Sequence, residues 1–180
     1  NLPPGFSYNI ISKYKDKMKD GLRVPNAADG MGCFEGDGDN VVLVRNHELG
    51  HFPVIQNTFR KNSPYGKGIT RYLNKNKNKF YDYKSKHTEC YGGTTTIVYN
   101  VKTQKIVDQH LSLSGTLVNC SGGQTPWGTW ISCEETVKKK QGKIYKNHGF
   151  NFEVTPLDSD NLNPPLPLRD MGRFRHEAVA

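Results

Sequence analysis

Three glutamates follow short apolar segments at a regular spacing. Glu48 comes after Val-Val-Leu-Val-Arg-Asn-His, Glu134 after Gly-Thr-Trp-Ile-Ser-Cys, and Glu177 after Gly-Arg-Phe-Arg-His. Glu134 and Glu177 are 43 residues apart, and Glu48 and Glu134 are 86 apart, which is twice that spacing. Carboxylates that converge repel one another unless they share a cation, and Ca²⁺ binds several carboxylate oxygens at once. The pattern therefore predicts a metal site formed by these three glutamates.

The same spacing indicates the elements that would bring the glutamates together. Blades of a β-propeller recur about every 40–50 residues, and the innermost strand of each blade lines a central channel. Glutamates at equivalent strand ends would meet near that axis. The alternative is coincidence among three weakly similar segments, in which case each glutamate is a surface residue at the end of a strand.

The residues around Glu48 also match the zinc-protease signature H-E-x-x-H, with His47 and His51 as the two histidines. Those histidines bind one zinc ion only when they lie one turn apart on a helix. Residues 41–44 are Val-Val-Leu-Val, which is typical of a buried strand, and Pro53 disfavours helix in the residue before it. We therefore do not expect a protease.

The whole chain is typical of an all-β protein. Its 180 residues include 18 Gly and 10 Pro, and alternating or β-branched runs predict short strands. These runs are residues 6–12, 41–44, 94–99, 105–111, 115–120, 128–133, 149–154 and 173–180, with 94–99 and 105–111 forming a hairpin. Only 16–22 and 136–146 have compositions compatible with helix. We expect one β-propeller domain over residues 1–180, built of four-stranded meander blades and incomplete, since about four blades fit this length.

Two segments account for the formal net charge of +8. Residues 60–89 contain nine Lys or Arg against two acidic residues, and residues 137–146 contain five Lys and no acidic residue. The remainder of the chain is consequently acidic. We interpret the basic stretches as solvated loop insertions at about 57–90 and 137–147. Aromatic residues between the cations of the first insertion would also suit single-stranded nucleic acid, but we do not expect nucleic acid to be a partner.

The remaining sequence features exclude some classes of protein. No apolar run approaches the roughly 20 residues that span a bilayer. None of the four cysteines lies in a C-x-x-C pair, so a zinc ribbon is not supported; two disulfides or buried thiols both stay open. No signal segment is recognisable, so we expect that any such segment is removed or lies outside these residues.

Several blocks of the sequence resemble the PhoX-type alkaline phosphatases. The blocks are Val-Arg-Asn-His-Glu-Leu-Gly (44–50), Gly-Gly-Thr-Thr-Thr (92–96), the long run 115–135 with Asn-Cys-Ser-Gly-Gly-Gln-Thr-Pro-Trp-Gly-Thr-Trp-Ile-Ser-Cys-Glu-Glu at its end, and Met-Gly-Arg-Phe-Arg-His-Glu-Ala (171–178). They occur in the family's order and span nearly the whole chain. The resemblance implies a β-propeller that hydrolyses phosphate monoesters at a cluster of iron and calcium ions.

The resemblance also implies roles for single residues. Glu134 and Glu177 would bind the metals, and Asn46 and Arg175 would hold the substrate phosphate through amide and guanidinium donors. Glu48, His47 and His176 are candidates of lower rank. The family's iron-binding cysteine would correspond to Cys90 or Cys33, with Cys90 as the candidate ligand, while Cys133 would be structural. Alternatives are an ion pair between Arg175 and Glu177 or Glu134, and a turn or backbone cap by Asn46.

From the residues and the resemblance together, we expect a metal-dependent phosphatase that acts on small phosphomonoesters. Its cofactors would be Ca²⁺ and Fe³⁺, the protein would be a monomer in the periplasm or outside the cell, and this part alone would be inactive or weakly active. The alternatives are a calcium-dependent propeller hydrolase that cleaves another ester or a lactone, and a metal-stabilised binding propeller without enzymatic activity.

Overall fold

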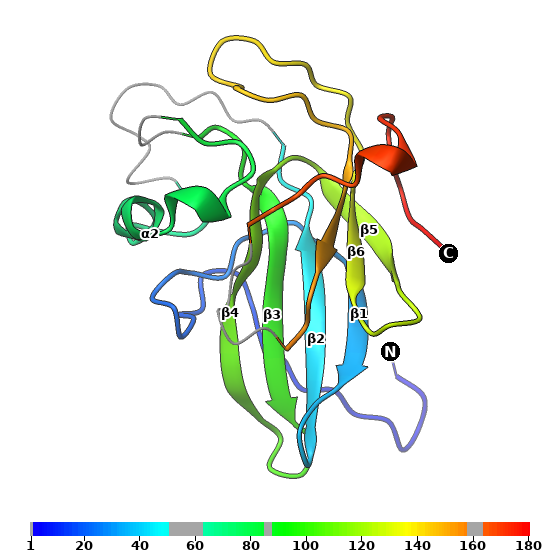
Figure 1. Cartoon of the computed structure of the whole chain (residues 1–180). Helices are drawn as coiled ribbons and strands as arrows, with labels where there is room; N and C mark the ends of the chain where they lie inside the picture. The colour runs from blue at the N-terminus through cyan, green and yellow to red at the C-terminus, as the bar shows by residue number, and fades with distance from the viewer. Residues whose placement is uncertain (1, 51–62, 85–87, 158–163) are drawn as a thin grey trace.

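Two antiparallel β-sheets form the body of the protein in the computed structural model (Figure 1). The structure describes residues 2–50, 63–84, 88–157 and 164–180. In each sheet the strands follow their order in the chain, so both sheets are meanders. The expectation of an all-β chain is confirmed. The first sheet has the four strands predicted for a blade and the second has three, and an arrangement of blades around a common axis stays a prediction.

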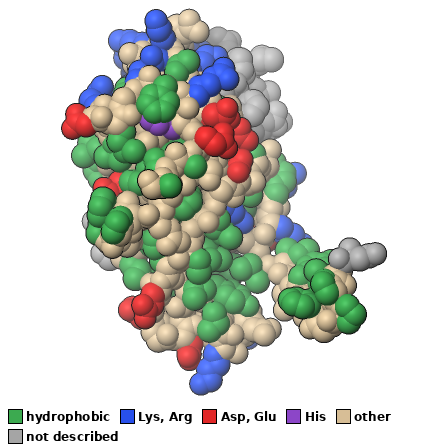
Figure 2. All heavy atoms as spheres, turned by 90° about the vertical axis from the view of Figure 1, so that its right-hand side faces the viewer, with side chains coloured by type: hydrophobic (Ala, Val, Ile, Leu, Met, Phe, Trp, Pro, Cys, Tyr) green, Lys and Arg blue, Asp and Glu red, His purple; other side chains and the backbone are tan. Residues whose placement is uncertain are grey.

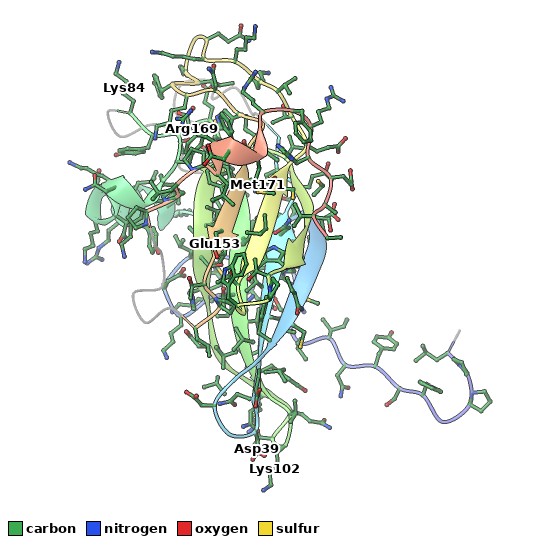
Figure 3. All side chains as sticks on the ribbon, turned by 45° about the vertical axis from the view of Figure 1, so that its right-hand side comes forward. Asp39, Lys84, Lys102, Glu153, Arg169 and Met171 are labelled. Atoms are coloured by element: carbon green, nitrogen blue, oxygen red, sulfur yellow. The ribbon has the colours of Figure 1, made fainter. Side chains whose placement is uncertain are left out.

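The first sheet contains β1 (Ala28–Glu35), β2 (Asn40–His47), β3 (Gly92–Asn100) and β4 (Lys105–Thr116). The first two strands are joined by the polar turn at residues 36–39, and the predicted β3–β4 hairpin is confirmed. Asn100 fixes the hairpin turn because its side-chain oxygen accepts hydrogen bonds from the amide and hydroxyl of Thr103. Lys102 and Asp39 mark this end of the sheet, opposite to Lys84 and Arg169 (Figure 3).

The second sheet contains β5 (Asn119–Gln124), β6 (Trp130–Glu134) and β7 (Asn151–Val154), and β5 lies against β1 and β2. The close approach of the two sheets depends on glycines in β1. A Cβ atom on Gly30 would lie 2.5 Å from the Ser121 hydroxyl, and one on Gly32 would lie 2.7 Å from the Trp130 ring. An apolar core fills the space between the sheets: Val44, Tyr81, Leu113, Trp130, Phe150, Phe152 and Val154.

A second core lies under the first basic insertion. The short helix α2 (Ile69–Lys75) and the 3₁₀ turn η1 (Lys77–Lys79) belong to this insertion, and α2 buries Ile69 and Leu73 completely. They pack with Met18, Leu22, Leu49 and Leu111, among others. The insertion is therefore partly a core-forming element, because two apolar residues spaced by four lie on one helical face between exposed cations.

The C-terminal segment runs back over the second sheet. After the 3₁₀ turn η2 (Arg169–Met171), the amide of Phe174 donates to the Gly149 carbonyl and the amide of His176 donates to the Glu134 carbonyl. These single bonds tie the segment to the sheet without making a strand. The prediction of a strand at 173–180 is therefore wrong.

Other local predictions also need correction. Residues 6–12 form an extended segment outside both sheets (Figures 1 and 3), with the side chains of Phe6, Tyr8 and Ile10 more than 70% exposed. The segments 16–22 and 136–146 contain turns with short β-bridges in place of helix. The predicted strand at 115–120 is divided between β4 and β5, because the chain turns at Val118, which has a φ of 52°. Among the described residues, no helix is both long and apolar enough to cross a lipid bilayer.

Candidate metal and phosphate site

A thiol and two carboxylates meet beside the end of β6. Cys120 comes from β5, Glu135 follows β6 directly, and Glu177 comes from the C-terminal segment. One potential ligand atom of each lies within 4.8 Å of those of the other two. Cys120 is buried, Glu135 is half-buried and Glu177 is exposed, so this group, which we call the Cys120 cluster, has one side open to solvent. Figure 2 shows acidic side chains gathered in a patch on this face of the molecule.

Glu48 and Asp29 extend the Cys120 cluster. Glu48 follows β2, and Asp29 is the second residue of β1. The pKa of Glu48 is raised, first by partial burial and then by the charge of Asp29, to which its side chain is hydrogen-bonded, and by the charges of Glu135 and Glu177. Carboxylates that raise one another's pKa gain from a shared cation. Two of the three predicted glutamates, Glu48 and Glu177, are therefore brought together.

The thiol of Cys120 is held in place by the C-terminal segment. Its Sγ atom lies 3.3 Å from the carbonyl oxygen of His176 and 3.2 Å from that of Glu177. Burial and the nearby negative charges raise the pKa of Cys120 to about 11, so the group is a thiol at neutral pH when no cation is bound. A cation bound here would take the place of the thiol proton.

Glu134 lies on a different and fully buried side of the strand end. Its Oε1 accepts hydrogen bonds from the amide of Leu117 at 2.8 Å and from His148 Nδ1 at 2.7 Å. Its Oε2 accepts from the amides of Gly149 and Phe150. Four donors thus occupy this carboxylate, and its role as a ligand of the exposed cluster stays a prediction. Its neighbour Glu135 is the one that lies beside Glu177.

Asn46 is also completely buried, and both ends of its amide are engaged. Its Nδ2 donates to the carbonyl of Ser121 at 2.7 Å, and its Oδ1 accepts from Trp130 Nε1 at 3.0 Å and from the Ser132 hydroxyl at 3.1 Å. The side chain therefore ties β2 to β5 and β6, which sets the position of Glu48 two residues later. Contact between Asn46 and a substrate phosphate stays a prediction.

The remaining sequence candidates lie around these two groups. Arg175 is exposed two residues before Glu177, while His176 is buried with its ring 3.7 Å from the Phe174 ring. His47 is buried between the Asn26 carbonyl and the Thr95 hydroxyl, and burial lowers its pKa to about 3, so it is neutral at pH 7. His51 lies outside the described residues. His47 belongs to a strand and Glu48 to a loop, as expected for a false match to the protease signature.

Cys90 lies in a second group, apart from the Cys120 cluster. Its Sγ is 3.6 Å from Nε2 of His148, which is 3.2 Å from Oδ2 of Asp82, and all three side chains are buried. Burial lowers the pKa of His148, but hydrogen bonds to Asp82, Cys90 and Glu134 outweigh it and raise the pKa to about 11. Cys33 is exposed on β1, and all four cysteines are free thiols.

Comparison with protein-family models decides what this chain is related to. The model of the alkaline phosphatase PhoX family matches residues 1–180, the whole chain. The chain belongs to the PhoX family. An alkaline phosphatase-like function therefore follows at the level of the family. Comparisons with curated proteins and with solved structures found no match.

Sequence reasoning missed three acidic or thiol groups of this PhoX protein's cluster. Glu135 could have been found from the Glu134-Glu135 pair, but the strand pattern does not say which of two neighbours faces solvent where a strand ends. Cys120 lies in the same sequence block as Glu134 and Glu135, and only the C-terminal segment, which folds back onto it, brings it beside Glu177. Asp29 lies in β1, and the glycines of β1 make its sequence unlike that of a strand, so this element was not predicted.

Proposed function

We propose that this chain provides part of the active site of a metal-dependent phosphatase that hydrolyses phosphate monoesters. The observation that carries the proposal is the Cys120 cluster, where a thiol and carboxylates from three separate parts of the chain meet on an accessible face. Membership of the PhoX family supports the reaction class. Asp29 and Glu48 add two further carboxylates at the margin.

The donor set of the Cys120 cluster fits the two metals that the resemblance implies. Carboxylate oxygens from Glu135, Glu177 and Glu48 suit Ca²⁺, which prefers hard oxygen ligands. The sulfur of Cys120 suits iron, since soft thiolate ligands favour transition metals over calcium. Metals bound here would neutralise charge on a phosphoryl group and activate the attacking oxygen. We assign Cys120 in place of Cys90 as the iron-binding thiol, because Cys120 lies beside the solvent-accessible carboxylates of Glu135 and Glu177, whereas the group around Cys90 is buried.

Arg175 is the proposed phosphate-binding residue of this chain. Arg175 is exposed and lies in the same segment as Glu177, and guanidinium groups bind two phosphate oxygens at once. Asn46 enters the proposal as a positioning residue, which holds β2 and thereby Glu48 against the second sheet. His47 supports the same strand end as a neutral hydrogen-bonding group.

The proposal is tested by turnover of p-nitrophenyl phosphate before and after treatment with EDTA, together with elemental analysis for calcium and iron. We expect activity that EDTA abolishes and that the two metals restore. A metal-replete, folded protein without phosphatase activity would contradict the proposal. Parallel assays with a lactone and a carboxylic ester distinguish the alternative of a calcium-dependent hydrolase of another ester.

A substitution separates phosphate binding from metal binding. Arg175→Ala should lower kcat/KM for p-nitrophenyl phosphate by about 100-fold, because it removes donors to the phosphoryl oxygens, and should leave the metal content unchanged. Arg71→Ala, which removes an exposed arginine of α2, is the matched control and should keep wild-type activity. Equal activity of the two variants would remove Arg175 from the site.

The proposal extends to partners and location. The substrates would be small phosphomonoesters, the protein would act as a monomer, and export from the cytoplasm would agree with the use of calcium. The open side of the Cys120 cluster supports access of a small molecule.

A further inference from the structure

We propose that Asp82, Cys90 and His148 form a second metal site, for a zinc-class transition metal ion, which fastens the two basic insertions to the sheets. The group shares no residue with the Cys120 cluster, and its three side chains are completely buried. The proposal does not depend on the phosphatase activity proposed above.

Two of the three spacings between the donor atoms match the edges of a coordination tetrahedron. Bond lengths of about 2.3 Å for Zn–S and about 2.0–2.1 Å for Zn–N and Zn–O give edges of about 3.5 Å between S and N and about 3.3 Å between N and O. Cys90 Sγ lies 3.6 Å from His148 Nε2, and His148 Nε2 lies 3.2 Å from Asp82 Oδ2. All three donor atoms lie within 4.8 Å of one another, so a small adjustment of the side chains would bring one ion into contact with all of them.

A hydrogen bond from His148 Nε2 can serve only one of the other two groups at a time. His148 Nε2 carries at most one hydrogen, yet both the Asp82 carboxylate and the Cys90 sulfur face it. A cation between the three groups would satisfy the carboxylate, the imidazole lone pair and a thiolate together.

The surroundings orient the donors as the outer partners of a metal site do. Glu134 Oε1 lies 2.7 Å from His148 Nδ1, and a carboxylate that accepts from one imidazole nitrogen directs the other toward a metal. Asp82 Oδ2 is fixed by the amides of Tyr145 and Lys146, each at 2.9 Å. The amide of Cys90 donates to the Thr88 hydroxyl at 3.0 Å. The orientation of His148 thus explains why the fully hydrogen-bonded carboxylate of Glu134 is buried beside it.

The chemistry of the donors selects the class of metal. A sulfur and an imidazole nitrogen beside one carboxylate favour zinc or another transition metal over calcium or magnesium. Leu117 and Ile144 pack against Cys90, which closes the site. Three side-chain donors leave the fourth position of a tetrahedral ion to a further oxygen, and the complete burial of the site, which keeps substrates away, favours a structural role.

The position in the chain shows what the metal would hold. Asp82 and Cys90 belong to the first basic insertion, and His148 directly follows the second. The ion would therefore link two segments rich in Lys, and a divalent cation with a thiolate and two carboxylates nearby leaves no excess positive charge between them. Loss of the metal should loosen both insertions and leave the sheets intact.

Zinc binding is tested in a Cys120→Ser background, so that the Cys120 cluster offers no thiolate. The protein is freed of metal with EDTA, dialysed against Zn²⁺ alone and studied by elemental analysis and zinc X-ray absorption. We expect about one zinc per chain with sulfur and imidazole in its ligand shell. The double variant Cys120→Ser, Cys90→Ser should lose this zinc, whereas Cys120→Ser, Cys33→Ser, which removes the exposed thiol, should keep it.

Absence of bound zinc in the folded Cys120→Ser protein would overturn the proposal. A zinc ligand shell of nitrogen and oxygen only, without sulfur, would also overturn the proposal. This result is decisive even if the Cys90→Ser variant does not fold. As a second measurement, Zn²⁺ should slow tryptic cleavage at residues 138–146 in Cys120→Ser by at least about tenfold, because a site that binds only the folded loop reduces its open population. Equal cleavage rates with and without zinc would contradict a fastening role.

Discussion

At the scale of single residues, the polar side chains nearest the candidate site are of two kinds: buried groups that hold the strands in place and groups that reach solvent. Asn46 and Glu134 are fully buried and saturated with hydrogen bonds, whereas Glu48, Glu135, Glu177 and Arg175 reach solvent. The sequence pattern names residues of both kinds, but it could not separate them. Burial at a strand end depends on how distant segments fold back, which local alternation does not encode.

Asn46→Ala should reduce the free energy of unfolding by about 2–4 kcal/mol. The substitution leaves the Trp130 indole and the Ser132 hydroxyl without their buried acceptor and the Ser121 carbonyl without a donor. Urea denaturation measures the change, with Asn74→Ala, an exposed site on α2, as the matched control. A loss no larger than that of the control would show that Asn46 does not hold the sheets together.

Glu153 on β7 gives a pH-dependent contribution to stability. Its Oε1 accepts from Thr129 Oγ1 and Trp127 Nε1, both at 2.6 Å, and these hydrogen bonds lower the pKa of Glu153 (Figure 3). Because its pKa is lower in the folded state, ionised Glu153 stabilises the fold at pH values above its unfolded pKa of about 4.5. This contribution to the free energy of unfolding is lost as the pH falls through the folded-state pKa. The wild type should therefore exceed Glu153→Gln in stability by about 0.5–1 kcal/mol at pH 7, because the contact is exposed.

This difference should narrow as the pH is lowered from 7 to 3, and urea denaturation at each pH measures it. Trp127→Phe removes one of the two donors and keeps a ring. Its stability should differ from that of the wild type by less than that of Glu153→Gln does, with the same dependence on pH. A difference that stays constant over this range would refute the contribution of the ionised carboxylate.

At the scale of elements, strands with a regular β-pattern could be predicted from the sequence. The glycine-rich strand β1 and the cation-rich helix α2 could not. The β3–β4 hairpin was predictable because β-branched residues precede a polar turn. β1 was not, since its glycines resemble a loop until the approach of Ser121 and Trp130 explains them. α2 was not predicted because Ile69 and Leu73 are its only aliphatic residues, and its stability comes from the core beneath it.

Gly122→Ala tests the close pairing of β5 with β6. A Cβ atom at Gly122 would lie only 1.7 Å from the carbonyl oxygen of Ile131, which is backbone and cannot yield without separating the strands. We expect a loss of at least about 2 kcal/mol in the free energy of unfolding. Gly50→Ala, where a Cβ atom meets nothing within 4 Å, is the control for the methyl group itself. Equal stabilities for the two variants would exclude the close approach.

At the scale of the whole molecule, the net charge of +8 results from basic segments beside an acidic site. In Figure 2, Lys and Arg side chains lie above the patch of acidic side chains on the same face. Arg173 joins the C-terminal segment to the second basic insertion, because its guanidinium donates a hydrogen bond to the carbonyl of Val137 at 2.6 Å. Such a field attracts anions to the site, and salt weakens it.

The double substitution Lys139→Gln, Lys140→Gln should lower kcat/KM for p-nitrophenyl phosphate about two- to fivefold at low ionic strength and have little effect in 1 M salt. Lys102→Gln with Lys105→Gln removes the same charge at the other end of the first sheet and serves as the control (Figure 3). An equal effect of both pairs would attribute the attraction to net charge alone.

The measurement that bears most directly on the candidate site compares the two neighbours Glu134 and Glu135. Folded Glu135→Gln should lose bound metal and at least about 100-fold in kcat/KM for p-nitrophenyl phosphate, since the carboxylate beside Cys120 and Glu177 is removed. Glu134→Gln should instead lower stability, because a buried carboxylate with four donors is replaced. Glu35→Gln, at the far end of β1, should behave as wild type. Full metal content and wild-type turnover in Glu135→Gln would contradict the assignment of the Cys120 cluster as the metal site of a phosphatase.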